Sequence, residues 1–135
     1  MSETPLLIRR ADDVKPETRR GGEIRTLLSP RTVGATAGFM GTATVAPGDW
    51  IAEHYHPYSE EFLYVVAGAI TVEIAGQAAT VGMREGVLVP KGARHRVSND
   101  RTEEAVIVFH LGPLAPRPEL GHVETEVRDP EQPTA

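Results

Sequence analysis

The sequence has no cysteine, few aromatic residues and no long hydrophobic run. It contains 135 residues, of which none is cysteine and 5% are aromatic. The absence of cysteine excludes a disulfide framework and thiolate metal sites, so histidine and carboxylate are left as the strong metal ligands. No apolar run approaches the roughly 20 residues that a transmembrane helix needs, so we expect no membrane partner.

Basic residues are outnumbered by acidic ones, which argues against nucleic acid as a partner. The formal net charge is −5, whereas a surface that binds phosphates would carry an excess of Lys and Arg. Near the N-terminus the apolar run Leu6–Ile8 is too short for the core of a signal peptide. We therefore expect a cytoplasmic protein.

Short β-prone runs separated by turn residues dominate the middle of the chain, at a spacing typical of a β-sandwich or small barrel. We predict an all-β fold with a jelly-roll-like barrel over residues 23–111. It follows an N-terminal arm, 1–22, and precedes a proline-rich tail, 112–135, that runs extended over the barrel or is disordered. The residues after Asp129 are expected to be disordered. The predicted strands are Glu23–Leu28, Ala35–Val45, Trp50–His56, Glu61–Val66, Ile70–Ala75, Ala78–Val81, Val87–Val89, His95–Ser98 and Ala105–Leu111.

Three histidines and a carboxylate in the middle of the chain outline a metal site. His54 and His56 are one residue apart in a predicted strand, so their side chains point to the same face. A turn after His56 would return Glu61 to that face, and His95 would arrive from a distant strand. Neutral imidazoles and a carboxylate that converge from rigid strands are what a metal ion requires.

Other residues near these ligands leave alternatives open. Strand alternation places Trp50 on the histidine face and Leu63 and Val65 on the Glu61 face, and with Val97 they would form an apolar pocket. His110, in the last predicted strand, is either an additional ligand, a base beside the metal, or exposed. His122, in the proline-rich tail, is expected to be exposed, as is Glu60.

The spacing of these residues resembles the two signature motifs of the cupin superfamily. Gly48, His54, His56, Glu61 and Gly68 match every fixed position of the first motif. In the second motif Pro90, Gly92, His95 and Asn99 match, but Arg84 stands where the family has its first glycine. Gly68 and Gly92 are expected to serve turns, and the Asn99 amide to stabilise one.

A narrower resemblance covers the run from His54 to Val66, which is similar to the small single-domain cupins of bacterial aromatic polyketide pathways. These proteins act as polyketide cyclases. The resemblance implies zinc in a histidine-rich site, and a poly-β-ketone substrate that is free or carried by an acyl carrier protein. It also implies ring closure by aldol condensation, with a zinc-polarised carbonyl and either metal-bound hydroxide or Glu61 as the base.

Two rival functions stay open on the sequence alone. The same imidazoles suit iron, manganese or nickel, and a redox-active ion would make the protein a dioxygenase. A cupin that binds a small molecule without catalysis is the other alternative. Whether Glu61 or His110 is the fourth ligand, and whether the chain forms a homodimer, also stay open.

Overall fold

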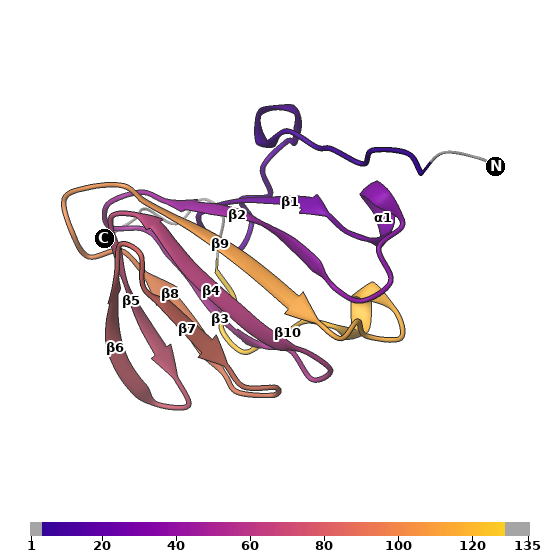
Figure 1. The fold of residues 1–135 in the computed structure, drawn as a ribbon. Coiled ribbons are helices and arrows are strands. Elements are labelled where there is room, and N and C mark those ends of the chain that lie inside the picture. The colour runs from indigo at the N-terminus through magenta and orange to yellow at the C-terminus, as the bar shows by residue number, and fades with distance from the viewer. Residues whose placement is uncertain (1–3, 129–135) are drawn as a thin grey trace.

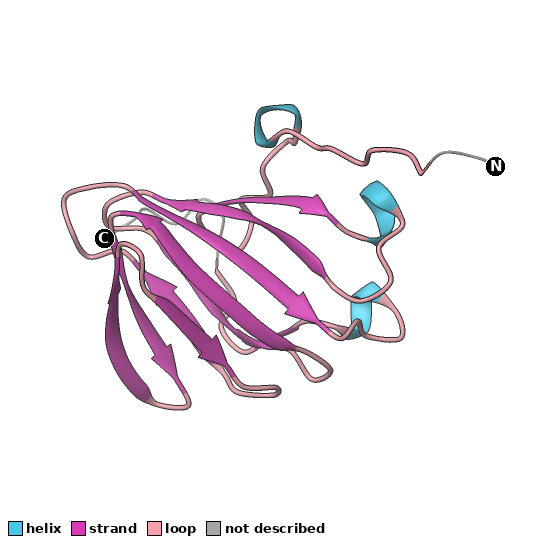
Figure 2. Cartoon of the chain, in the orientation of Figure 1, coloured by secondary structure: helices cyan, strands magenta, loops and turns pink. Residues whose placement is uncertain are grey.

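Two antiparallel β-sheets packed face to face form the body of the molecule (Figure 1). The computed structural model describes residues 4–128, so the prediction for residues after Asp129 lies outside the described residues. Within residues 4–128 each sheet has five strands, in the orders β1-β2-β9-β4-β7 and β10-β3-β8-β5-β6. This arrangement confirms the predicted all-β fold, and Figure 2 shows how little of the chain is helical.

The strand bounds are close to those predicted, with one further strand in the tail. The elements are η1 (Ala11–Asp13), β1 (Glu23–Leu28), α1 (Pro30–Val33), β2 (Phe39–Val45), β3 (Trp50–Tyr55), β4 (Glu60–Ala67), β5 (Ala69–Ile74), β6 (Gln77–Gly82), β7 (Gly86–Val89), β8 (His95–Ser98), β9 (Ala105–Gly112), η2 (Pro118–Leu120) and β10 (Val123–Glu124).

Strand alternation decides which side chains enter the space between the sheets. On β4, Glu61, Leu63 and Val65 are buried, while the residues between them are exposed. On β9, Ile107 and Phe109 are buried in the same way. This period of two places the carboxylate of Glu61 inside an otherwise apolar layer.

The predicted strand Ala35–Val45 begins later than expected because a single helical turn, α1, precedes it. Ser29 accepts a hydrogen bond from the backbone N–H of Thr32, and the Thr32 hydroxyl accepts one from the Ser29 backbone N–H. Gly34 ends the turn with a φ of 71°. These local hydrogen bonds compete successfully with the β-ladder.

The described part of the tail lies extended against the second sheet, which is the first of the two predicted alternatives. Strand β10 pairs with β3. Arg20 and Glu124 form an ion pair of 2.9 Å, Arg96 pairs with Glu126 at 3.1 Å, and Arg128 reaches Asp49. Proline restricts the chain, and these contacts with the body of the molecule then fix the course of the tail.

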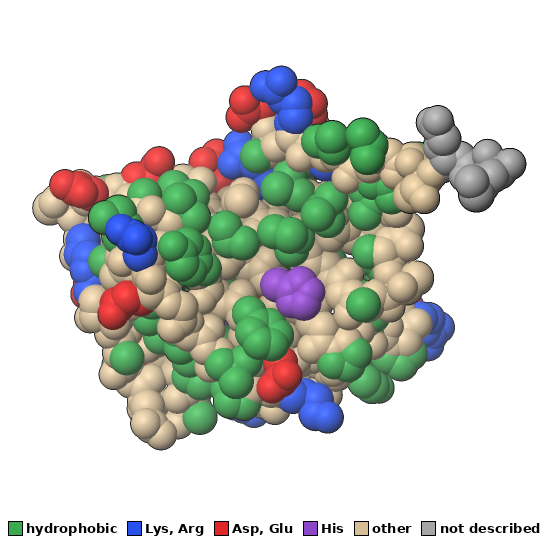
Figure 3. Space-filling view, in the orientation of Figure 1, with side chains coloured by type: hydrophobic (Ala, Val, Ile, Leu, Met, Phe, Trp, Pro, Cys, Tyr) green, Lys and Arg blue, Asp and Glu red, His purple; other side chains and the backbone are tan. Residues whose placement is uncertain are grey.

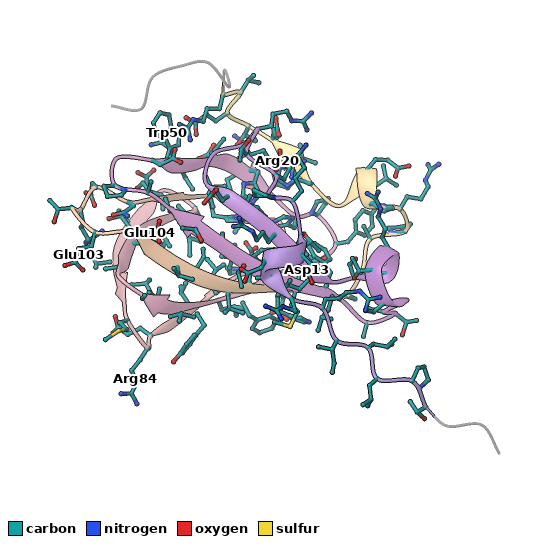
Figure 4. The ribbon with its side chains drawn as sticks, turned by 90° about the horizontal axis from the view of Figure 1, so that it is seen from above. Asp13, Arg20, Trp50, Arg84, Glu103 and Glu104 are labelled. Atoms are coloured by element: carbon teal, nitrogen blue, oxygen red, sulfur yellow. The ribbon has the colours of Figure 1, made fainter. Side chains whose placement is uncertain are left out.

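Arg84 adopts the turn conformation for which the family uses glycine. Its φ is 70°, and Figure 4 shows the side chain pointing away from the ribbon. Because the side chain is exposed, it meets no steric obstacle beyond its own backbone. The departure from the motif therefore leaves the turn in place, at a cost of about 1–2 kcal/mol in backbone strain.

The residues from 4 to 128 contain no helix of the length and hydropathy that crossing a membrane would require.

Asn99 joins the loops at the end of the barrel opposite the α1 turn. Its buried amide nitrogen donates to the carbonyls of Val45, at 2.9 Å, and Glu103, at 2.8 Å. Its side-chain oxygen accepts from the backbone N–H of Arg101 at 3.0 Å. The side chain thus satisfies three backbone groups that β-strand pairing leaves open.

Replacing Asn99 by alanine should lower the free energy of unfolding by about 2–4 kcal/mol, because buried backbone groups would lose their partners. Urea denaturation monitored by circular dichroism measures the change. Asp100→Ala, at an exposed neighbouring position, is the control and should shift stability by no more than about 0.5 kcal/mol. Equal effects of the two substitutions would contradict this role of Asn99.

Candidate metal site

Four buried side chains converge between the two sheets. His54 on β3 lies directly opposite His95 on β8, His56 follows β3, and Glu61 projects from β4 in the facing sheet. Within residues 4–128, one ligand atom from each of these four residues lies within 4.8 Å of the others. The protein therefore has a buried group of three imidazoles and a carboxylate that could bind a metal ion.

An irregularity in β3 changes which of its residues face the site. The register between β3 and β8 shifts between Ile51 and His54, and Ile51 and Ala52 are both buried. As a result Ile51, not Trp50, lies on the inner face with His54. The prediction that Trp50 lines the pocket is wrong, because a bulge breaks simple alternation.

Trp50 instead packs beneath cationic side chains at the periphery of the molecule, where Figure 4 shows it. Its ring centroid lies 3.6 Å from the guanidinium carbon of Arg128 and 5.2 Å from that of Arg96. These contacts are cation–π interactions that help hold the tail.

Each of the three imidazoles is oriented by a hydrogen bond from its Nδ1 atom to a backbone carbonyl. The distances are 2.7 Å from His54 to Ala52, 2.9 Å from His56 to Gly121, and 2.9 Å from His95 to Ala93. A carbonyl can only accept, so each Nδ1 carries the proton and each neutral ring keeps a lone pair on Nε2. This tautomer is the one that metal-binding histidines adopt.

The carboxylate of Glu61 faces two of these imidazoles. Its Oε1 atom lies 2.8 Å from Nε2 of His95 and 3.7 Å from Nε2 of His56. Both Nε2 atoms are buried without a well-aligned hydrogen bond. A lone pair on His95 that faces a carboxylate oxygen at this distance is repulsive unless a cation lies between them. A proton would satisfy this pair, whereas a metal ion would satisfy the whole group.

Burial keeps most of these rings neutral. Burial, aided by His95, lowers the pKa of His54 to about 2, and burial also lowers the pKa of His56. Burial alone would lower the pKa of His95, but Glu61 outweighs it and raises that pKa. Neutral rings have lone pairs free for a metal ion at pH 7.

His110 lies outside the site. It is on β9 between the buried residues Phe109 and Leu111, so alternation turns its side chain to the outer face of the sheet. There its ring centroid lies 5.7 Å from that of Phe62. The predicted alternatives of a ligand or base at His110 are therefore wrong, and the alternative of an exposed strand residue holds.

His122 was expected to be exposed, but the tail brings it to the site. Its ring stacks on that of His54 with a centroid distance of 4.4 Å and an interplanar angle of 17°. Burial and the nearby Arg20 lower its pKa to about 3. Its Nε2 atom is buried without a hydrogen-bond partner. No periodic pattern marks this residue, because its placement depends on a long-range contact of the tail.

The four-residue group forms part of the wall of a largely apolar cavity of about 720 Å³. Of the residues predicted to form the pocket, Leu63 and Val97 line this cavity. Val65 lies outside the cavity lining and belongs to the core. Sequence reasoning missed several further apolar lining residues, namely Ile24, Phe39, Ile51, Ile107, Phe109 and Leu111. The size is that of a small-molecule site.

The metal-free protein should become less stable as the pH falls below about 6.5. Below that pH the histidines of the unfolded chain bind protons, because they have the ordinary pKa of histidine. In the folded protein His54 and His122 stay unprotonated, because their pKa values are lowered. Each such residue contributes a slope of about 1.4 kcal/mol per pH unit, and the raised pKa of His95 opposes this trend. Urea denaturation between pH 7 and 5 measures it. In His122→Gln the slope should be shallower, and an unchanged slope would show that His122 protonates freely.

Replacing His95 by alanine should remove most of the bound metal while the barrel survives, because the apolar core does not depend on an ion. Elemental analysis and far-ultraviolet circular dichroism measure the two effects. His110→Gln is the matched control, because it removes an imidazole from the outer face of the other sheet. This variant should keep its full metal content. Metal loss in both variants would place the ion elsewhere.

Comparison with known proteins gives the family. A family model described as the cupin domain matches residues 41–111, more than half of the chain. Among solved structures, an uncharacterised conserved protein with a double-stranded β-helix domain from Klebsiella pneumoniae aligns with a TM-score of 0.72. That alignment covers 90% of this chain and 99% of the other at 17% identity, and so supports the fold alone.

Relatives from Streptomyces extend the similarity to most of the chain. Protein SchB of S. halstedii is 56% identical over 96% of this chain and 94% of its own length. Polyketide synthase CurC of S. cyaneus is 54% identical over 84% and 74% of the two chains. Tetracenomycin polyketide synthase protein TcmJ of S. glaucescens is 47% identical over 84% and 76%. The predicted resemblance to small cupins of polyketide pathways is confirmed, and the chain belongs to the cupin family.

Proposed function

We propose that this protein is a zinc-dependent cyclase that closes and aromatises a ring in a poly-β-ketone. The observation that supports it most is the convergence of three Nε2 atoms and a carboxylate on the wall of an apolar cavity of about 720 Å³. The relatives named for polyketide synthases support a polyketide as the occupant of that cavity.

His54, His56 and His95 would hold the ion through Nε2, with Glu61 beside them. When bound, zinc would act as a Lewis acid that polarises a carbonyl oxygen and so acidifies the adjacent methylene group. Aldol closure transfers no electrons to the protein, which is why we propose zinc and not iron, manganese or nickel.

Glu61 is the proposed base. Among the described residues, 4–128, Glu61 is the one residue of the cavity lining that carries a carboxylate. A carboxylate whose second oxygen is free to face the substrate can remove the methylene proton and return it when water leaves. The buried setting protects this proton from exchange with solvent.

The cavity walls would bring the reacting carbons together. Phe39 and Phe109 pack edge to face with ring centroids 6.3 Å apart, and Leu63 and Leu111 continue the apolar surface. Such walls favour a folded polyketone over an extended one and exclude water that would divert it. At one end His122 has an unpaired Nε2 available to hydrogen-bond a substrate oxygen.

Arg20 and Arg31 line the same cavity and would favour a substrate that carries negative charge. Arg20 already pairs with Glu124 at 2.9 Å. Arg31 therefore is the better candidate for contact with the phosphate of a carrier-bound chain. The substrate would be either a free polyketone or one attached to an acyl carrier protein, and the assay should use both.

Replacing Glu61 by glutamine should lower cyclisation of a poly-β-ketone by about 100-fold or more, since the amide cannot accept the proton. Product analysis with zinc added to saturation separates this effect from weaker metal binding. Glu60→Gln is the matched control, because Glu60 is exposed on the opposite face of β4. Full cyclisation by Glu61→Gln would remove Glu61 from the role of base.

Elemental analysis of the purified protein, combined with oxygen uptake, distinguishes the cyclase from a dioxygenase. We expect zinc and cyclised product without oxygen consumption. Iron or manganese together with oxygen uptake on a diketone would overturn the proposal in favour of a dioxygenase. Tight binding of a polyketone without any conversion would instead indicate a binding protein.

A further inference from the structure

The cavity beside the four-residue group opens to solvent at one end of the molecule. Among the described residues that line it, the exposed ones are Pro30, Arg31, Thr36, Pro116 and Pro118. They belong to the α1 turn with its following loop and to the tail segment around η2, which Figure 1 shows at the same end of the molecule. A substrate would therefore enter between the α1 turn and η2.

The cavity continues past the four-residue group into the sandwich. Along β4, Glu61 stands in the row nearest the opening and Leu63 in the next row. Ala43 on β2 lies opposite Ile107 on β9, one row deeper again. Since a strand rises about 3.4 Å per residue, this third row lies about 14 Å along the strands from Glu61. The part of the cavity beyond Glu61, here called the inner compartment, is lined by Ala43, Ile51, Leu63, Val97, Ile107 and Phe109.

The inner compartment has a closed floor. In the row below Ala43, Val45 lies opposite Ala105, and both are fully buried outside the cavity lining. Val65 on β4 is also fully buried in the core. Figure 3 shows that side chains cover the outer side of the first sheet as well, where hydrophobic groups gather around a histidine. A chain that enters at the opening therefore has to end at this floor.

Two small residues on β2 leave this compartment open. Gly41 has a structural reason to be small, because a Cβ there would lie 2.9 Å from Cζ of Phe109 and nearer still to the carbonyl oxygen of Arg25. Ala43 lines the compartment at its deepest row. The size of the side chain at position 43 therefore sets how deep the compartment is.

The two ends of the cavity differ in polarity. The side chains that line the inner compartment contain no polar atom, whereas Arg31 and Thr36 stand at the opening. Burial of a charged or polar group without a partner is unfavourable, and burial of an alkyl group is favourable. A polyketone has an alkyl starter end and a carboxyl-derived end. The starter end would thus enter first, while the carboxyl-derived end stays at the opening.

We infer that the inner compartment receives the starter end of the polyketone and, through Ala43 at its floor, sets which carbonyl lies beside the four-residue group. This inference rests on the proposed function for the identity of the chain. A chain whose starter end touches the floor is held at a fixed depth, so carbonyls at a fixed distance from that end meet Glu61 and the histidines. The position of the new ring then follows from the depth of the compartment.

A chain-length series measures this depth. The probes are saturated acyl thioesters of N-acetylcysteamine, which carry no carboxylate and cannot undergo ring closure, and calorimetric titration of the purified protein gives their affinities. We expect the affinity to rise roughly fourfold per added methylene until the chain reaches the floor, and then to stop rising. In Ala43→Leu this limit should come about two methylenes earlier, because the added carbons occupy the floor.

Two further variants separate depth from a folding defect. Ala78→Leu is the matched control, because it makes the same change at an exposed position of β6 outside the cavity lining, and it should keep the wild-type limit. Ile107→Val removes one carbon from the row of Ala43 and should move the limit about one methylene later. A folding defect would not lengthen the chain that the protein accepts.

Cyclisation assays connect depth with ring position. On a poly-β-ketone, Ala43→Leu should close the ring about one ketide unit nearer the starter end. An affinity without a length limit, the same limit in wild type and Ala43→Leu, or an unchanged ring position despite a shifted limit would overturn the inference. Shifted limits in a protein that cyclises no polyketone would overturn the proposed function alone and support a compartment that selects chains by length.

Discussion

The hydrogen bonds from three buried imidazoles to backbone carbonyls are the constraint on which the site depends. They place a proton on each Nδ1, which leaves the Nε2 atoms of His56 and His95 facing Glu61. Two of these carbonyls, from Ala52 and Ala93, lie two residues from the ring they orient. The third, from Gly121, belongs to the tail, so the course of the tail and the orientation of His56 are linked. Loss of the tail contact would free one of the three rings of the candidate metal site.

The first sheet separates two environments with different roles. Its inner face supplies Glu61, Leu63 and Phe109 to the core and the cavity, whereas its outer face exposes Phe62 and Tyr64. Because side chains alternate along a β-strand, the proposed base Glu61 and its chain neighbour Phe62 point to opposite faces of the sheet. A slip of β4 by one residue would turn its inner side chains outward and its outer side chains inward. The pairing of β4 with both β7 and β9 opposes that slip. The proposed role of Glu61 therefore depends on this register.

Much of the fold and part of the site followed from local patterns. Short alternating runs predicted the strands, and the spacing of His54, His56, Glu61 and His95 predicted residues that the structure brings together. The failures share a physical origin. The bulge that turns Trp50 outward depends on pairing with β8, which the residues of β3 alone do not reveal. His110 has a buried residue on each side, so its outward orientation follows from alternation once the inner face of β9 is known.

The sequence by itself determined the strand order along the chain, the four converging residues and the family, because period-two alternation and motif spacing are local properties. Only the tertiary structure decided that His122 joins the site and His110 does not. A proline-rich tail has no periodic face, so its position depends on ion pairs such as Arg20–Glu124 and on pairing with β3. The Arg20–Glu124 contact joins residues 104 positions apart, and no local pattern in a single sequence encodes such a contact.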